Sequence, residues 1–171
     1  MEQINKYEHL GIYLENVDHL DVKTIEGEVS LRQFISGMLS YYPWWMLALY
    51  RIRALVVNIL RLVKHDKPET LPVILPAELS FEPGENATFF IVSTARENLY
   101  WVAHTPEDKH LKAWFGVVSE SLDINNSRFH VFTSVRYRHW TGPLYFNLIR
   151  PFHHLVVLSM MKAGVGRSGN A

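Results

Sequence analysis

The fold is decided by residues 110–163, which read HLKAWFGVVSESLDINNSRFHVFTSVRYRHWTGPLYFNLIRPFHHLVVLSMMKA. Apolar and polar residues alternate over His110–Glu120 and again over Arg128–Arg138, and this period of two is typical of strands. The short turn sequence DINNS separates them, so the two strands are expected to pair antiparallel. After Pro143 the apolar residues recur every three or four positions to about Ala163, which predicts a long C-terminal helix.

Each of these two strands has an apolar face and a polar face. The apolar face carries Leu111, Ala113, Phe115 and Val117, together with Phe129, Val131, Thr133, Val135 and Tyr137. The polar face carries Lys112, Glu120, Arg128, His130, Arg136 and Arg138. This alternation predicts an antiparallel sheet with one face buried and the other largely in solvent.

The C-terminal helix has an apolar stripe that is expected to face the sheet. The stripe comprises Tyr145, Leu148, Ile149, Phe152, Val156, Ser159 and Met160, and the opposite side carries Asn147, Arg150 and His154. Pro151 falls inside the helix, where it removes one backbone hydrogen bond and is expected to kink the axis. The tail from Gly164 to Ala171 is expected to fray.

The N-terminal part adds one strand and two helices. Residues 1–17 show little periodicity and are expected to be loosely held, whereas Val17–Glu26 alternates like a strand. Ser30 and Gln33 have the spacing of a capping box, which predicts a helix that runs to about Tyr42. Pro43 ends that helix and begins a second one that reaches about Lys64, because a proline suits the first turn of a helix.

A proline-rich linker, His65–Pro76, separates the helices from the remaining strands. These strands are predicted over Leu79–Glu82, Ala87–Arg96 and Leu99–His104. The order of elements predicts an α+β fold in which a curved antiparallel sheet wraps around the long C-terminal helix, with two helices after the first strand. Residues 1–171 are expected to form a single domain with a core of about 17–163.

The composition excludes several classes of protein. There is no cysteine, so disulfides, thiolate zinc sites and cysteine nucleophiles are excluded. The 17 Lys and Arg residues balance 17 Asp and Glu residues, so no nucleic-acid partner is expected. The N-terminal residues lack the features of a signal peptide, which makes the cytoplasm the expected location. Arginines interrupt the apolar segment Tyr41–Val63, so no transmembrane segment is predicted.

Three stretches of the sequence resemble a known family, and the specific part of the match is the Gly-x-Leu-Tyr-x-x-x-Ile-Arg-Pro-Phe-His run that begins at Gly142. They are Tyr100-Trp101, Asp108-Lys109-His110-Leu111 and Gly142-Pro143-Leu144-Tyr145-Phe146-Asn147-Leu148-Ile149-Arg150-Pro151-Phe152-His153. Together they resemble a bacterial domain family of unknown function, whose members occur alone or attached to the C-terminus of NAD-dependent epimerase-like proteins. The resemblance covers about residues 17–163.

That family is similar in turn to the START-like superfamily, also called the helix-grip or SRPBCC superfamily. The superfamily includes the birch-pollen-allergen fold, polyketide cyclases and lipid-transfer domains. The resemblance therefore implies a helix-grip fold with a ligand pocket, but it implies no particular reaction. It implies no redox role either, since these residues contain no epimerase-like domain.

Motifs for cofactor, metal or nucleophile chemistry are weak in this sequence. Gly164–Gly169 spells the dinucleotide-binding fingerprint, but it follows a helix and not a strand. The nine histidines form no His-Glu-x-x-His motif. Ser40 and Ser159 lie in no nucleophile elbow. No cofactor, metal ion or catalytic residue is therefore assigned.

A candidate ligand site lies where the C-terminal helix faces the sheet. It comprises Trp101, Phe115, Thr133, Tyr137, Tyr145, Ile149 and His153. The aromatic rings either line a pocket or fill the core. His153 either orients a polar ligand group as a neutral imidazole or ties the kinked helix to the sheet. Arg150 is expected on the surface.

Three functions are consistent with this sequence. The leading hypothesis is non-enzymatic binding of a small, mostly apolar ligand between the helix and the sheet. The second is an enzyme of polyketide-cyclase or isomerase type that uses His153 as proton donor or acceptor. The third is a protein- or membrane-interaction module with exposed aromatic residues such as Trp44 and Trp45. The first two require a pocket of about 300–1,000 Å³, and the third requires an exposed apolar patch. Homo-oligomer formation is left open.

Overall fold

The structure is a computed structural model that describes residues 6–46, 48–49, 73–106 and 110–166. Within these residues the strands are β1 (His19–Gly27), β2 (Asn86–Ala87), β3 (Phe90–Arg96), β4 (Tyr100–His104), β5 (Leu111–Ser121) and β6 (Ser127–Tyr137). The longer helices are α2 (Leu31–Leu39) and α4 (Thr141–Gly166), and the 3-10 helices are η1 (Glu8–Tyr13) and η2 (Pro76–Glu78). Residues 44–46 and 48–49 are also helical. The rest of the predicted second helix, and most of the predicted linker, lie outside the described residues.

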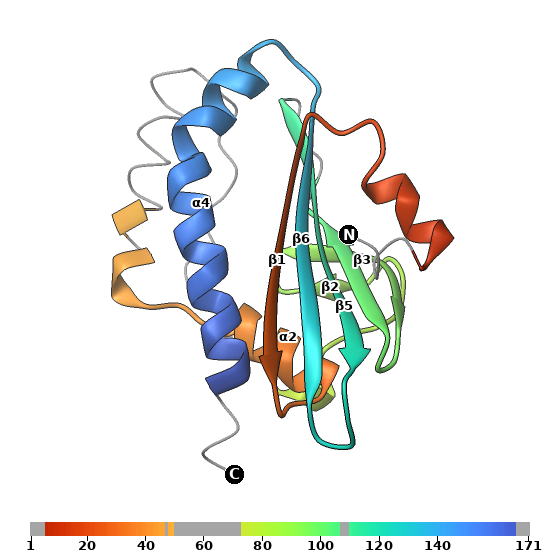
Figure 1. Cartoon of the computed structure of the whole chain (residues 1–171). Coiled ribbons are helices and arrows are strands. Elements are labelled where there is room, and N and C mark those ends of the chain that lie inside the picture. The colour runs from red at the N-terminus through yellow and green to blue at the C-terminus, as the bar shows by residue number, and fades with distance from the viewer. Residues whose placement is uncertain (1–5, 47, 50–72, 107–109, 167–171) are drawn as a thin grey trace.

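The strands form one antiparallel sheet in the order β1-β6-β5-β4-β3-β2. The edge strand β1 pairs with β6, which is distant in sequence, so that Thr133 pairs with Asp21 on one side and with Phe115 on the other. Helix α4 lies along one face of the curved sheet, with α2 near the lower end (Figure 1). This arrangement is the α+β helix-grip fold that the sequence predicts.

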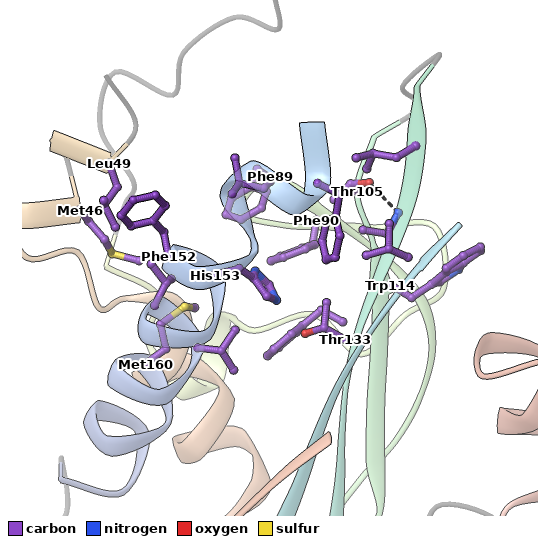
Figure 2. Close-up of a pocket in the computed structure, with 18 of the residues that line it drawn as sticks. Met46, Leu49, Phe89, Phe90, Thr105, Trp114, Thr133, Phe152, His153 and Met160 are labelled. Carbon is purple, nitrogen blue, oxygen red and sulfur yellow. Dashed lines mark hydrogen bonds between the residues drawn. The ribbon is translucent and has the colours of Figure 1, made fainter. Parts of the chain in front are cut away.

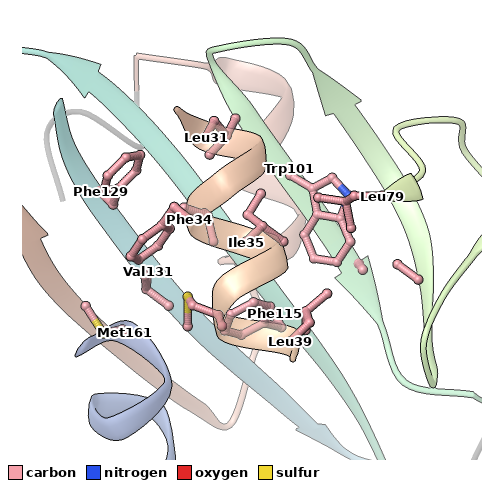
Figure 3. Close-up of a cluster of buried hydrophobic side chains, with 14 of the residues drawn as sticks. Leu31, Phe34, Ile35, Leu39, Leu79, Trp101, Phe115, Phe129, Val131 and Met161 are labelled. Atoms are coloured by element: carbon pink, nitrogen blue, oxygen red, sulfur yellow. The ribbon is translucent and has the colours of Figure 1, made fainter. Parts of the chain in front are cut away.

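Helices α2 and α4 enclose the main hydrophobic core against the sheet (Figure 3). The predicted capping box is present, because the Gln33 amide donates to Ser30 Oγ over 3.3 Å and the Ser30 amide donates to Gln33 Oε1 over 2.9 Å. Helix α2 ends at Leu39, before the predicted Tyr42. Its Phe34 stacks on Phe129 of β6, with ring centroids 4.1 Å apart and planes at 5°. This stack holds α2 on the sheet.

The second face of the sheet is not largely in solvent, so that prediction is wrong. The N-terminal segment, which was expected to be loosely held, forms η1 and lies over this face (Figure 1). Leu10 of η1 is completely buried, at 0% exposure. It belongs to a small second cluster with Tyr100, Val102, Val118 and Phe132. On this face, η1 therefore covers the apolar residues that alternate with the charged ones.

Two of the predicted strands differ from the structure. Leu79–Glu82 is not a strand, because its carbonyl groups bond to side chains. Arg32 Nη1 donates to the Leu79 oxygen over 2.6 Å, and Trp101 Nε1 donates to the Ser80 oxygen over 3.0 Å. The predicted strand Ala87–Arg96 is broken at Thr88, whose φ of 59° is left-handed, and it folds into the β2–β3 hairpin.

Helix α4 is longer than predicted. It continues to Gly166, and Gly164 is buried in the helix instead of belonging to a frayed tail. A Cβ atom added to Gly164 would lie 2.8 Å from the carbonyl oxygen of Phe34, so this glycine lets α4 approach α2 closely. Pro151 lies inside the helix as predicted, and the axis bends in the N-terminal part of the helix (Figure 1).

The predicted apolar stripe of α4 faces the sheet only in part. Leu148 and Phe152 are 52% and 40% exposed, because the helix is apolar on more than one side. The exposed side also carries Leu144, Leu155 and Leu158. Even so, none of the helices in the described residues is long and apolar enough to cross a lipid bilayer.

Candidate functional site

A cavity of about 330 Å³ lies between α4 and the sheet (Figure 2). Helix α4 contributes Tyr145, Phe146, Leu148, Ile149, Phe152, His153, Val156, Val157 and Met160. The strands and the loops beside them contribute Phe89, Phe90, Thr105, Leu111, Ala113, Trp114, Phe115, Thr133 and Val135. The end of α2 and the segment after it contribute Leu39, Tyr41, Tyr42, Met46 and Leu49.

The lining of the cavity is almost entirely apolar. Among the described residues that form it, none is Asp, Glu, Lys or Arg. Its polar side chains are those of Tyr41, Tyr42, Thr105, Thr133, Tyr145 and His153. The hydroxyl of Thr105 lies 3.4 Å from the Ala113 amide, which can donate to it, so this group is already used within the protein (Figure 2).

Two polar atoms in this lining are buried without a partner. They are Nε2 of His153 on α4 and Oγ1 of Thr133 on β6, and neither has a hydrogen-bond partner among the described residues. The imidazole ring points from the helix toward the sheet, and Thr133 lies on the facing wall (Figure 2). A buried polar atom that makes no hydrogen bond costs about 1–3 kcal/mol, and a group that bonded to either atom would offset that cost.

His153 is neutral at physiological pH. Burial lowers the pKa of its imidazole to about 4, and the Asp21 carboxylate opposes this effect only in part. A neutral imidazole has one nitrogen that donates a hydrogen bond and one that accepts. His153 can therefore contact a polar group without bringing a charge into the cavity.

A polar cluster borders the cavity where α4 meets β1. Lys23 forms an ion pair with Asp21, and its Nζ lies 2.9 Å from Nδ1 of His154. Burial acts to raise the pKa of Asp21, but Lys23 and His154 outweigh it and the pKa is lowered. Burial, together with the charge of Arg150, lowers the pKa of His19. The cluster connects the helix to the edge strand and lies beside the cavity.

The structure brings together five of the seven residues that the sequence singled out. Phe115, Thr133, Tyr145, Ile149 and His153 all line the cavity.

The other two do not line it. Trp101 is completely buried in the core, and Tyr137 packs against Phe146 with ring centroids 6.1 Å apart. Arg150 is exposed, as expected. Of the two aromatic residues considered for an interaction surface, Trp44 is exposed and Trp45 is half-buried.

Sequence reasoning missed one wall of the cavity. Tyr41, Tyr42 and Met46 belong to the aromatic-rich run after α2, which was interpreted as the junction of two helices, as a segment too interrupted to span a membrane and as a possible interaction surface, but not as part of the ligand site. Phe89 and Phe90 were placed inside one strand, whereas the chain turns at Thr88 and both residues line the cavity. The density of aromatic residues in these two segments was the signal from which this wall of the cavity could have been predicted.

The described part of the chain has no group of three His, Cys, Asp or Glu side chains placed to hold a metal ion.

Comparison with known proteins gives a family. The family model "Protein of unknown function (DUF2867)" matches residues 12–160. No curated protein matches the chain.

Among solved structures, norcoclaurine synthase from Thalictrum flavum is similar at 13% identity and a TM-score of 0.46, covering 87% of this chain and 84% of that one. A putative uncharacterized protein from Rhizobium leguminosarum is similar at 9% identity and a TM-score of 0.45, covering 88% of this chain and 97% of that one. A hypothetical protein from Helicobacter pylori is similar at 11% identity and a TM-score of 0.44, covering 91% and 93%.

Proposed function

This chain belongs to the DUF2867 family of proteins of unknown function, and we propose that it binds a small, mostly apolar ligand between α4 and the sheet. The observation that carries this proposal is an apolar cavity into which two unpartnered polar atoms point, Nε2 of His153 and Oγ1 of Thr133. An apolar lining with few polar groups that fix orientation is the usual make-up of a small-molecule site.

The size of the cavity supports this role. Its volume of about 330 Å³ lies at the lower end of the range of small-molecule pockets, which is about 300–1,000 Å³. Large aromatic side chains occupy both walls, yet they do not close the space between them. A protein that used these rings only to fill its core would have no comparable space there.

Binding without catalysis explains the state of His153 better than acid–base chemistry does. A general acid or base works best when its pKa lies near the working pH. Burial lowers the pKa of His153 to about 4, so at neutral pH the imidazole is a weak base and lacks the acidic imidazolium proton that a general acid would give. These properties suit an uncharged hydrogen-bonding contact and support the binding role over the cyclase- or isomerase-like alternative.

The proposal is tested with a matched pair of tryptophan substitutions on α4. Ile149 lines the cavity, whereas Leu155 lies on the exposed side of the same helix and does not line it. Binding of the neutral fluorescent probe N-phenylnaphthylamine is titrated for the wild type, Ile149→Trp and Leu155→Trp. We expect saturable binding by the wild type and by Leu155→Trp, and an affinity at least about ten-fold lower for Ile149→Trp, because the larger ring fills the cavity.

Native mass spectrometry of the gently purified wild type provides a second measurement. A retained small molecule that is absent from Ile149→Trp would support the proposal and would give the mass of the ligand. Failure of the wild type to bind the probe saturably, or equal affinity in the two variants, would contradict it.

A further inference from the structure

We infer that the ligand is a neutral aromatic molecule that carries one hydroxyl or carbonyl group, held between His153 on α4 and Thr133 on β6. The inference rests on the proposed function and adds the chemical class of the ligand. It depends on three properties of the cavity: its two unpartnered polar atoms, its lack of ionic side chains and its aromatic walls.

The two polar atoms define the polar group of the ligand. Both belong to groups that can donate or accept, since the threonine hydroxyl does both and Nε2 of a neutral imidazole does either, according to its tautomer. A ligand hydroxyl placed between them can donate to one and accept from the other. A carbonyl oxygen can accept from both. Either group would satisfy the two atoms that have no partner among the described residues.

The lining also argues against a charged ligand. No Lys, Arg, Asp or Glu is among the described residues that form the cavity, and the pKa of His153 is about 4. An ammonium or carboxylate group would lose its hydration there without gaining a counter-ion, which is strongly unfavourable. A neutral polar group costs much less to desolvate, and the two hydrogen bonds can offset that cost.

Aromatic rings on the sheet side favour a flat ligand. Phe90 lies between Phe89 and Phe115, with ring centroids 4.1 Å from the first and 5.7 Å from the second. Phe90 lies on the same side of the cavity as Thr133 in the view of Figure 2. Aromatic rings prefer offset-stacked or edge-to-face contacts with one another, and such contacts add to the gain from apolar burial. A ligand ring can therefore pack against these phenylalanine rings while its polar group reaches Thr133.

Three probes of similar shape test the inference: naphthalene, β-naphthol and β-naphthoate. Their affinities are measured at neutral pH by isothermal titration calorimetry with the wild type, Thr133→Val and His153→Leu. Valine keeps the shape of threonine and replaces its hydroxyl with a methyl group. For the wild type we expect β-naphthol to bind about ten-fold more tightly than naphthalene, and β-naphthoate to bind more weakly than β-naphthol.

In each variant the preference for β-naphthol over naphthalene is expected to fall to about three-fold or less, while naphthalene binds at least as well as to the wild type. This pattern separates a hydrogen-bonding role from a structural one, because a damaged cavity would weaken all three probes together.

Two results would overturn the inference and leave the proposed function standing: equal binding of naphthalene and β-naphthol, or tightest binding of β-naphthoate, in a wild type that binds N-phenylnaphthylamine. The inference is also wrong if a wild type that binds N-phenylnaphthylamine binds none of the three probes. If the wild type does not bind N-phenylnaphthylamine either, the proposed function fails with it.

Discussion

Nζ of Lys23 on the edge strand β1 lies 2.9 Å from Nδ1 of His154 on α4, and this contact connects the C-terminal helix to the sheet beside the cavity. An ammonium group can only donate, so a hydrogen bond between these two atoms runs from Lys23 to Nδ1. The same lysine also forms an ion pair with Asp21, whose Oδ2 lies 3.2 Å from Nδ1 of His154. The Lys23 ammonium therefore contacts both Asp21 on the strand and His154 on the helix.

Replacing Lys23 is expected to destabilise the protein. The side chains of Lys23 and Asp21 are only 13% and 17% exposed, so Lys23→Met would leave the Asp21 carboxylate largely buried without its counter-ion. We expect the free energy of unfolding in urea at neutral pH to fall by about 1–3 kcal/mol. The double variant Asp21→Asn/Lys23→Met is the control and should recover at least half of the loss. A neutral effect of Lys23→Met would contradict this account of the cluster.

The stability of the protein should depend on pH through His153. Its pKa is about 4 in the folded protein against 6.5 for an ordinary histidine, so the unfolded chain binds the proton first as the pH falls. The stabilisation is complete above pH 6.5 and is lost as the pH falls through about 4. Between about pH 7.5 and about pH 5 this group alone should remove about 2 kcal/mol from the free energy of unfolding.

The control for this pH dependence is His153→Leu, which keeps every other titratable group. Urea denaturation at the same two pH values should show a decrease that is smaller than that of the wild type by about 2 kcal/mol. Asp21, whose pKa is lowered, remains ionised over this range and so does not disturb the comparison. Identical decreases for the two proteins would show that His153 titrates normally.

Two glycines near the end of α4 should respond in opposite ways to alanine. Gly164 faces α2, and a Cβ atom there would lie 2.8 Å from the Phe34 carbonyl oxygen. We expect Gly164→Ala to lower the thermal and urea stability by about 1–3 kcal/mol, because the two helices must move apart. Gly166→Ala is the matched control, since a Cβ at Gly166 would meet no atom of the described residues within 4 Å. It should be neutral or stabilising by up to about 1 kcal/mol.

Phe34 and Phe152 should differ in their contribution to stability. Phe34 is completely buried and stacks on Phe129, whereas Phe152 is 40% exposed. Truncation of a core ring typically costs about 3–5 kcal/mol, which is the loss expected for Phe34→Ala. Phe152→Ala should cost only about 1–2 kcal/mol, because the ring keeps part of its surface in water when folded. Equal losses in chemical denaturation would mean that Phe152 is buried in solution.

Thr133 and His153 both line the cavity, on the faces that the sequence pattern predicted. Thr133 was assigned to the inner face because it shares the alternation of Phe129 and Val131, and His153 was assigned there because it lies at the edge of the apolar stripe. Both assignments depend only on local periodicity, which determines the residues that share one face of a strand or helix. Trp101 shares the inner face too, but its ring lies in the core beside α2, away from the cavity.

The sequence by itself determined the long central strands, the capped helix at Ser30 and the C-terminal helix with Pro151 inside it. Each of these features is encoded by residues that lie close together in the sequence, either within one strand or within one or two turns of a helix.

Only the tertiary structure decided that β1 pairs with β6, that η1 covers the second face, that Arg32 and Trp101 engage the backbone of Leu79 and Ser80, and that Phe152 stays partly exposed. All of these depend on contacts between segments far apart in the chain. Periodicity indicates which side chains need a covering partner, but the packing of distant segments decides which partner covers them and where a space is left between them.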